Sequence, residues 1–146
     1  MTENVIISIR GKQLFEDQEP DVTELVTPGT LEHDPEEGYK LSYAESELTG
    51  LEGTQTVFRI RGNQVTLTRE GGVNSMMVFE EGTRHLSMYE TPFGALSVGI
   101  NTKHMRTDLS PSGGEIEIDY AIEVDHAVTG QNFFQIRIQQ VPKFKQ

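Results

Sequence analysis

The sequence predicts an all-β fold: an antiparallel up-and-down β-barrel of about eight to ten strands, formed by residues 1–146 as a single domain. Three observations predict it. Apolar and polar residues alternate with a period of two, as in strands with one buried face. Turn-forming residues separate these stretches, and no window shows a long run at helical spacing. A barrel is favoured over a sandwich because no helix is available to cover a sheet face.

The alternation defines the expected strands in chain order. It is longest near residue 120, where isoleucines and a tyrosine share one face and mostly acidic residues share the other. The clear stretches are 5–10, 39–44, 58–61, 96–101, 116–124 and 134–139, and the weaker ones are 22–27 and 76–79. The segment 45–51 offers at most one helical turn, because Gly50 interrupts it.

Turn signals lie between these stretches. Proline supplies a fixed φ and glycine a permissive one, and both favour reversals of the chain. The expected turns are 19–21, Pro28 with Gly29, 34–38, Gly71 with Gly72, 91–94 and 110–114.

Gly62 and Asn63 predict a two-residue hairpin loop of the primed type. This loop places Phe58 opposite Leu67, and the same register places Thr56 opposite Arg69 on the apolar face. A slip by one residue would break the apolar matches.

Glu81 and Gly82 predict a second two-residue loop. It would place Met77 opposite Leu86 and Ser75 opposite Met88.

The charge balance argues against polyanionic partners. Twelve basic and 23 acidic residues give a formal net charge of −11, and no basic stripe is present. Nucleic acid and anionic membrane surfaces would be repelled by that field, so neither is an expected partner.

The chain has no cysteine, which excludes disulfides, cysteine nucleophiles and thiolate metal sites. The first residues carry neither a basic cluster nor a long apolar run, so no signal peptide is expected. We therefore expect a soluble, cytoplasmic protein.

The central segment resembles a known family. Residues 75–82 (SMMVFEEG) and 89–94 (YETPFG) are similar to the YwiB-like family of small bacterial proteins, and so are 54–56 (TQT), 69–72 (REGG) and 114–120. The resemblance extends from the first strand to about residue 138. It implies a calycin-like, lipocalin-type barrel. It implies no activity, because the family is a domain of unknown function.

A polar set is expected on the inner face of the barrel. The hairpin register places Arg69 there, and alternation places Tyr43, Glu45, Ser75, Glu90 and Tyr120 there. Small-molecule pockets combine apolar walls with a few convergent polar groups, and a guanidinium grips carboxylates or phosphates. The alternatives are that Arg69 pairs with Glu45 or Glu90, or lies in water at the rim.

Metal and catalytic sites are not expected. None of the four histidines, His33, His85, His104 and His126, is spaced as a ligand pair. The cluster of His33, Asp34, Glu36 and Glu37 is interpreted as a solvated acidic loop. Serine, histidine and aspartate are present, but no nucleophile motif is.

The sequence therefore favours a non-enzymatic function without cofactor: binding of a small anionic or amphipathic molecule in or at the mouth of the barrel. The alternative is a protein interaction or assembly module that uses the outer face or an edge strand, with a homodimer among the options. A hydrolase is a distant third. The acidic residues 115, 117, 119, 123 and 125 are expected on the solvated face of one strand.

Overall fold

The computed structural model describes residues 2–14, 21–45, 53–71, 75–91, 94–124 and 127–141. These residues form ten β-strands in one closed antiparallel barrel, which confirms the predicted fold class. Each strand pairs with its neighbours in the sequence, and β10 pairs with β1 to close the barrel. The strands are β1 (Thr2–Leu14), β2 (Asp21–Asp34), β3 (Gly38–Ala44), β4 (Thr54–Arg61), β5 (Gln64–Gly71), β6 (Ser75–Glu80), β7 (Arg84–Thr91), β8 (Gly94–Ser110), β9 (Gly113–Val124) and β10 (Ala127–Gln140).

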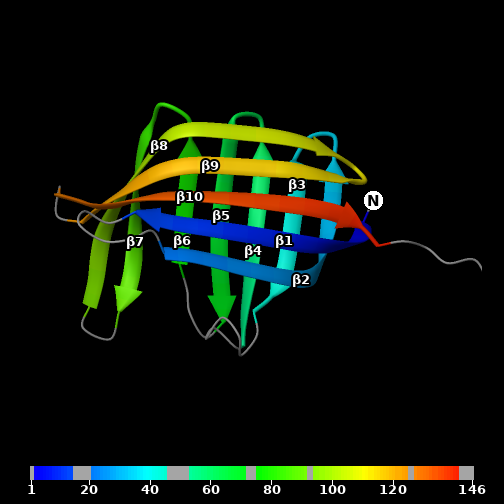
Figure 1. Ribbon diagram of the computed structural model, residues 1–146, viewed down its shortest axis with the longest axis horizontal. Helices are drawn as coiled ribbons and strands as arrows, with labels where there is room; N and C mark the ends of the chain where they lie inside the picture. Colours follow the sequence, from blue (N-terminus) through cyan, green and yellow to red (C-terminus); the bar gives the residue numbers. More distant parts are fainter. Residues whose placement is uncertain are drawn as a thin grey trace, which may run out of the picture.

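The barrel is flattened into two layers whose strands run across each other (Figure 1). One layer holds β1, β2, β9, β10 and most of β8, and the other holds β3 to β7. Strand β8 starts beside β7 and continues into the first layer. Its pairing with β9 shifts register between Thr102 and His104, and such a bulge lets a strand bend around a barrel corner.

The β4–β5 hairpin has the predicted register. Phe58 pairs with Leu67, and Thr56 pairs with Arg69. Gly62 has a φ of 59°, which is the left-handed conformation that a primed two-residue turn requires and that glycine adopts without strain. The turn chemistry therefore determines which side chains of this hairpin face inward.

The predicted register of the β6–β7 hairpin is wrong. Ser75 pairs with Tyr89, one residue from its predicted partner. The loop comprises residues 81–83, with the Thr83 amide donating to the Glu80 carbonyl at 3.0 Å. The additional loop residue reverses the alternation, so Leu86 is 65% exposed and Ser87 is buried.

The expected turn at Pro28 and Gly29 is also wrong, because both residues lie within β2. A Cβ atom at Gly29 would lie 2.4 Å from Ile7 Cδ1 and 2.5 Å from the Ser42 carbonyl oxygen. The glycine therefore allows β2 to approach β1 and β3 closely, and it does not reverse the chain.

The second half of β8 was not predicted as a strand. Thr102 is fully buried, His104 is exposed, and Met105 packs against the core, so the bulge interrupts the period-two pattern.

The expected turns at 34–38 and 110–114 do connect β2 to β3 and β8 to β9. Thr91 pairs with Gly94 across the turn between β7 and β8, whose residues 92 and 93 lie outside the described part. The expected turns at 19–21 and at Gly71 with Gly72, and the helical turn at 45–51, also fall largely on residues outside it.

Apolar side chains fill the middle of the barrel and one of its ends. At that end the Tyr39 hydroxyl donates to the Leu109 carbonyl at 3.3 Å, and its ring lies 4.5 Å from the ring of His33. The fully buried core includes Ile7, Leu31, Leu41, Val65, Phe79, Ile100, Ile116, Ile118 and Ile136.

Replacing Ile116 by alanine should lower the free energy of unfolding by about 2–5 kcal/mol, because the side chain is fully buried and leaves a cavity. Val26→Ala is the matched control: Val26 is 69% exposed, and its loss should change stability by less than about 0.5 kcal/mol. Urea denaturation of the three proteins measures both effects. Equal midpoints for Ile116→Ala and wild type would contradict this packing.

Candidate functional site

A cavity of about 370 Å³ lies at the other end of the barrel. Among the described residues, the first half of β2 pairs with β1 alone, because β2 and β3 pair only from Thr30 with Ser42 onward. The cavity reaches this separation, with Asp21 and Thr23 on one side and Tyr43 on the other. It is lined by Ile9, Gly11, Lys12, Gln13, Asp21, Thr23, Tyr43, Phe58, Leu67, Arg69, Met77, Tyr120, Ile122, Asn132, Phe133 and Phe134. The barrel is thus packed at one end and hollow at the other.

A polar row crosses the inner face at this end. Tyr43 pairs with Thr56, Thr56 pairs with Arg69, and Arg69 pairs with Ser75, on four adjacent strands. Directly opposed side chains have Cβ atoms about 4.5–5.5 Å apart. The register alone therefore brings these four residues, called the polar row below, into one line at the edge of the apolar core.

Arg69 is the cation of this row. Its residue is half-buried and lines the cavity. Its Nε atom is buried, and among the described residues it has no hydrogen-bond partner. Buried guanidinium nitrogens normally meet an acceptor, because desolvating a charged donor without one is costly.

Glu45 is satisfied by neutral hydroxyl groups. The residue is only 8% exposed, and its Oε1 accepts a 2.6 Å hydrogen bond from Thr56 Oγ1. The Tyr43 hydroxyl also donates to it. Burial, followed by the nearby Glu45 carboxylate, raises the pKa of Tyr43 well above its ordinary value. Tyr43 is therefore a protonated donor at neutral pH.

Aromatic rings form the inner wall of the cavity. The rings of Phe79 and Tyr120 are 4.9 Å apart, and Phe134 lies 5.7 Å from Phe79 and 5.8 Å from Tyr120. Phe58 lies 6.2 Å from Phe134. Edge-to-face contacts of this kind are favourable arrangements of aromatic pairs. Burial raises the pKa of Tyr120 to about 12, and the Arg69 charge partly opposes that shift.

The predicted site residues fall into four groups. Arg69, Tyr43 and Tyr120 line the cavity, Glu45 contacts Thr56 and Tyr43 behind its wall, and Ser75 ends the polar row. Glu90 pairs with Ala95 in the β7–β8 ladder, but its side chain lies outside the described part.

Sequence reasoning missed several residues of the site. Asn132 is buried and lines the cavity beside Phe134. Extending the alternation of Phe134, Ile136 and Ile138 by one step would have found it. Lys12 and Asp21 also line the cavity, but no pattern in the sequence distinguishes them from other charged residues near strand ends.

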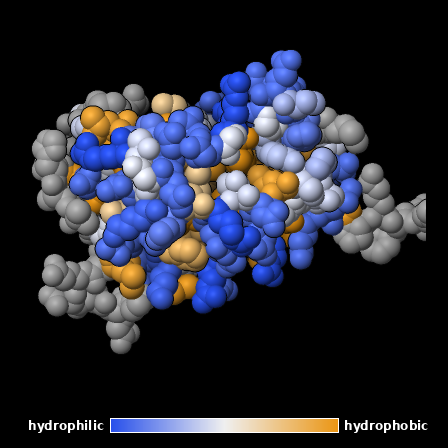
Figure 2. Space-filling model, turned by 90° about the horizontal axis from the view of Figure 1, so that it is seen from above, coloured by the Kyte–Doolittle hydropathy of each residue, from blue (hydrophilic) through white to orange (hydrophobic). Residues whose placement is uncertain are grey.

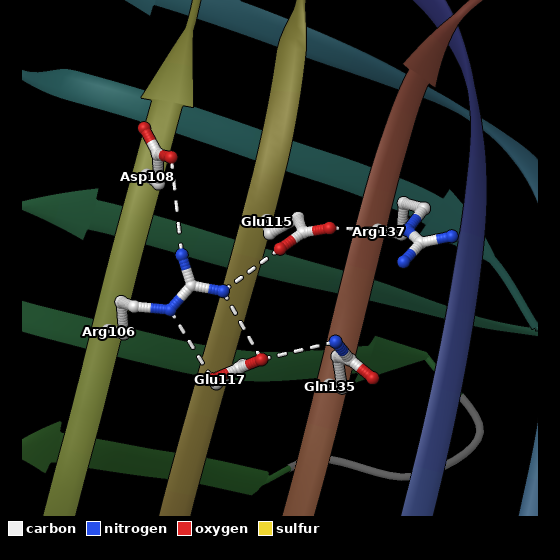
Figure 3. Close-up of polar contacts among 6 residues, drawn as sticks. All are labelled: Arg106, Asp108, Glu115, Glu117, Gln135 and Arg137. Carbon is white, nitrogen blue, oxygen red and sulfur yellow. Dashed lines mark hydrogen bonds and ion pairs between the residues drawn. The ribbon is translucent and has the colours of Figure 1, made fainter.

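A second polar cluster lies on the outer face of β8, β9 and β10 (Figure 3). Arg106 Nη2 lies 2.9 Å from Glu115 and 3.2 Å from Glu117, while Arg137 Nε lies 3.3 Å from Glu115. The hydrogen bonds from Arg106 hold the pKa of Glu115 below its ordinary value. Glu115 and Glu117 thus lie on the outer face as predicted, in cross-strand ion pairs that support register; Asp125 lies outside the described part.

The acidic loop at 33–37 has a structural explanation. Asp34 Oδ1 accepts hydrogen bonds from the amides of Glu36 at 2.8 Å and Glu37 at 3.2 Å. An aspartate that caps a turn in this way fixes the β2–β3 loop.

Within the described ranges, no group of three or more metal-ligating side chains is close enough to hold an ion. Among the same residues, no helix is long and apolar enough to cross a membrane.

Comparison with known proteins finds similarity at the level of family and fold. Residues 7–136 match the family model described as "Domain of unknown function (DUF1934)". The chain is 26% identical over 125 residues to the "Uncharacterized beta-barrel protein YwiB" of Bacillus subtilis (strain 168), which covers 85% of this chain and 86% of that protein. The crystal structure of the ywiB protein from Bacillus subtilis superposes with a TM-score of 0.83 at 22% identity, over 97% of this chain and 94% of that one. This likeness shows that the two share the barrel fold.

The buried phenol of Tyr120 predicts an alkaline loss of stability. Its pKa is about 12 in the folded protein against an ordinary 10.0, so the unfolded chain loses the proton first. The stabilisation is fully present below the unfolded value and is lost as the pH rises through the folded value. Melting temperatures across this range should fall less steeply for Tyr120→Phe than for wild type. Parallel curves would show that this phenol is not desolvated.

Proposed function

We propose that this chain, which belongs to the DUF1934 family, a domain of unknown function, binds a small amphipathic molecule. The family match confirms the resemblance inferred from the sequence. The ligand lies in the cavity at the open end, with an anionic head group on Arg69. One observation carries the proposal: the Arg69 Nε is buried at a cavity, and among the described residues it meets no acceptor.

The energetic argument concerns that guanidinium. A buried donor without a partner costs about 1–3 kcal/mol, and more when it is charged. Glu45 does not relieve this cost, because its carboxylate accepts from Thr56 and Tyr43 instead. A ligand carboxylate or phosphate would supply the missing acceptor, and Arg presents its donors in a planar fork that fits both.

The cavity also suits the apolar part of such a ligand. Its volume of about 370 Å³ lies at the small end of the usual range of ligand pockets, about 300–1,000 Å³. Phe58, Phe134 and Leu67 supply apolar wall, while Asn132 and Tyr120 supply polar groups. Walls that are mostly apolar with a few placed polar groups are typical of small-molecule sites.

Binding is favoured over hydrolysis. In the described part of the chain, the Ser110 hydroxyl lies 3.0 Å from that of Ser112 and donates to the Gly113 carbonyl at 3.3 Å, so its partners are not histidines. His85 lies 3.0 Å from Glu80 at the β6–β7 turn. A nucleophile–base pair within reach of each other is the minimum geometry for a serine hydrolase.

A second candidate is partner binding or homodimer formation along β2. Within the described residues, the segment 21–29 has a strand neighbour on one side only, and Val22 and Val26 are exposed on it. Unpaired strand edges accept added strands. Elsewhere, hydrophobic groups on the face in Figure 2 are separated by hydrophilic ones. The molecular mass in solution, measured by light scattering, tests the homodimer.

Three further expectations belong to the same proposal. The calycin-type barrel would place this cavity where barrels of that kind hold ligands. A cytoplasmic location is supported by the absence of cysteine and the acidic composition. The net charge of −11 also supports a preference for small ligands over nucleic acid or anionic membranes.

Arg69→Met should weaken ligand binding without destabilising the free protein, because the substitution removes a guanidinium whose buried Nε has no acceptor among the described residues. Arg59→Met is the matched control, since Arg59 is exposed on the outer face of the same hairpin. Loss of a hydrogen bond to a charged group, about 1.5–3 kcal/mol, should weaken binding about tenfold to a hundredfold.

A thermal-shift screen measures this with small carboxylates, phosphates and sulfonates on apolar bodies, each with its neutral analogue. Wild type and Arg59→Met should be stabilised to the same extent by the same anions, and Arg69→Met should be stabilised much less by each of them. If no compound stabilises wild type and Arg69→Met melts far below it, Arg69 is a structural residue and the proposed function is wrong.

A further inference from the structure

We infer that the cavity selects singly charged aromatic carboxylates and discriminates against phosphates and other doubly charged anions. This inference rests on the proposed function and specifies its ligand class. It follows from three features of the site: the charges around the cavity, the donors that face it, and the rings that form its wall.

The charges around the cavity leave room for one negative charge at most. Lys12 and Asp21 line the mouth with opposite signs. Deeper inside, the Arg69 guanidinium is followed across the polar row by Thr56, which holds the buried carboxylate of Glu45. Tyr43 lies close to both charges, because Glu45 raises the pKa of its phenol and Arg69 lowers it. An anion on Arg69 therefore lies close to a second anion.

That proximity penalises a second ligand charge. A phosphate monoester carries a charge of about −1.5 to −2 at neutral pH, against −1 for a carboxylate. Like charges in a partly desolvated site repel far more strongly than in water. Deep in the cavity, the described groups offer the Arg69 guanidinium and neutral hydroxyls, while the charge of Lys12 at the mouth is opposed by that of Asp21. The cavity lining therefore supplies little to offset the additional charge of a phosphate.

The donors match the two oxygens of a carboxylate. A guanidinium binds a carboxylate through two parallel N–H groups, and the buried Nε of Arg69 is one such donor without a partner. Tyr120 lines the same cavity, and the charge of Arg69 lies close enough to its phenol to lower the pKa of that group against the effect of burial. Arg69 and Tyr120 together supply donors from β5 and β9.

The wall favours a flat aromatic body. Phe58, Tyr120 and Phe134 all line the cavity, and Phe79 fixes two of their rings from behind at 4.9 and 5.7 Å. Edges and faces of aromatic rings attract a further ring more strongly than a saturated ring of equal size.

Isothermal titration with four matched compounds tests this inference: hydrocinnamate, its amide, cyclohexanepropionate and phenethyl phosphate. Wild type should bind hydrocinnamate about tenfold or more tightly than the amide or the phosphate, and more tightly than the saturated acid. Glu45→Gln should reduce the discrimination against phosphate, whereas Glu117→Gln, which removes an acid on the outer face, should leave it unchanged.

The outcomes separate the two proposals. If phenethyl phosphate binds wild type as tightly as hydrocinnamate, the selectivity is wrong although the cavity still binds ligands. If none of the compounds binds and the wider anion screen also fails, the proposed function itself is wrong. If Glu45→Gln does not fold, the ranking of the four compounds by wild type decides the question alone.

Discussion

The register of the β4–β5 hairpin is the constraint on which the rest of this structure depends. Because successive side chains of a strand point to opposite faces, a slip of one residue would turn Phe58, Leu67 and Arg69 outward together. Gly62 prevents that slip by adopting the left-handed backbone of a two-residue turn. Phe58 and Leu67 therefore reach the core, and the same register places Arg69 on the inner face.

Arg69 lies inside because its strand continues past the point where the core ends. The interior between β3 and β10 is filled by fully buried isoleucine, leucine and phenylalanine side chains, and the polar row begins where that packing stops. A guanidinium inside a fully packed barrel would be far more costly than one beside a cavity. The hydroxyl groups of Thr56 and Tyr43 allow Glu45 to be buried as well without pairing it with Arg69.

The outer face is organised by a different interaction. Arg106, Glu115, Glu117 and Arg137 alternate in sign across β8, β9 and β10 (Figure 3). Exposed ion pairs contribute little individually to stability, but opposite charges on adjacent strands favour the observed register over its alternatives. The inner face therefore supplies stability and the site, and the outer face supports the alignment of the longest strands.

The sequence by itself determined the fold class, the inward face of most strands and the register of one hairpin, because these depend on local alternation and on glycine at a turn. It also identified Arg69, Tyr43 and Tyr120, which tertiary structure places around one cavity. Only the tertiary structure decided the β6–β7 register, since the two-residue and three-residue loops use similar residues. In the sequence, Gly29 beside a proline predicts a turn. Only the folded structure shows that this glycine is needed because Ile7 and Ser42 leave no space for a side chain. Which end of the barrel is hollow also depends on contacts between distant strands, such as Tyr39 with Leu109, and no local pattern in the chain encodes such contacts.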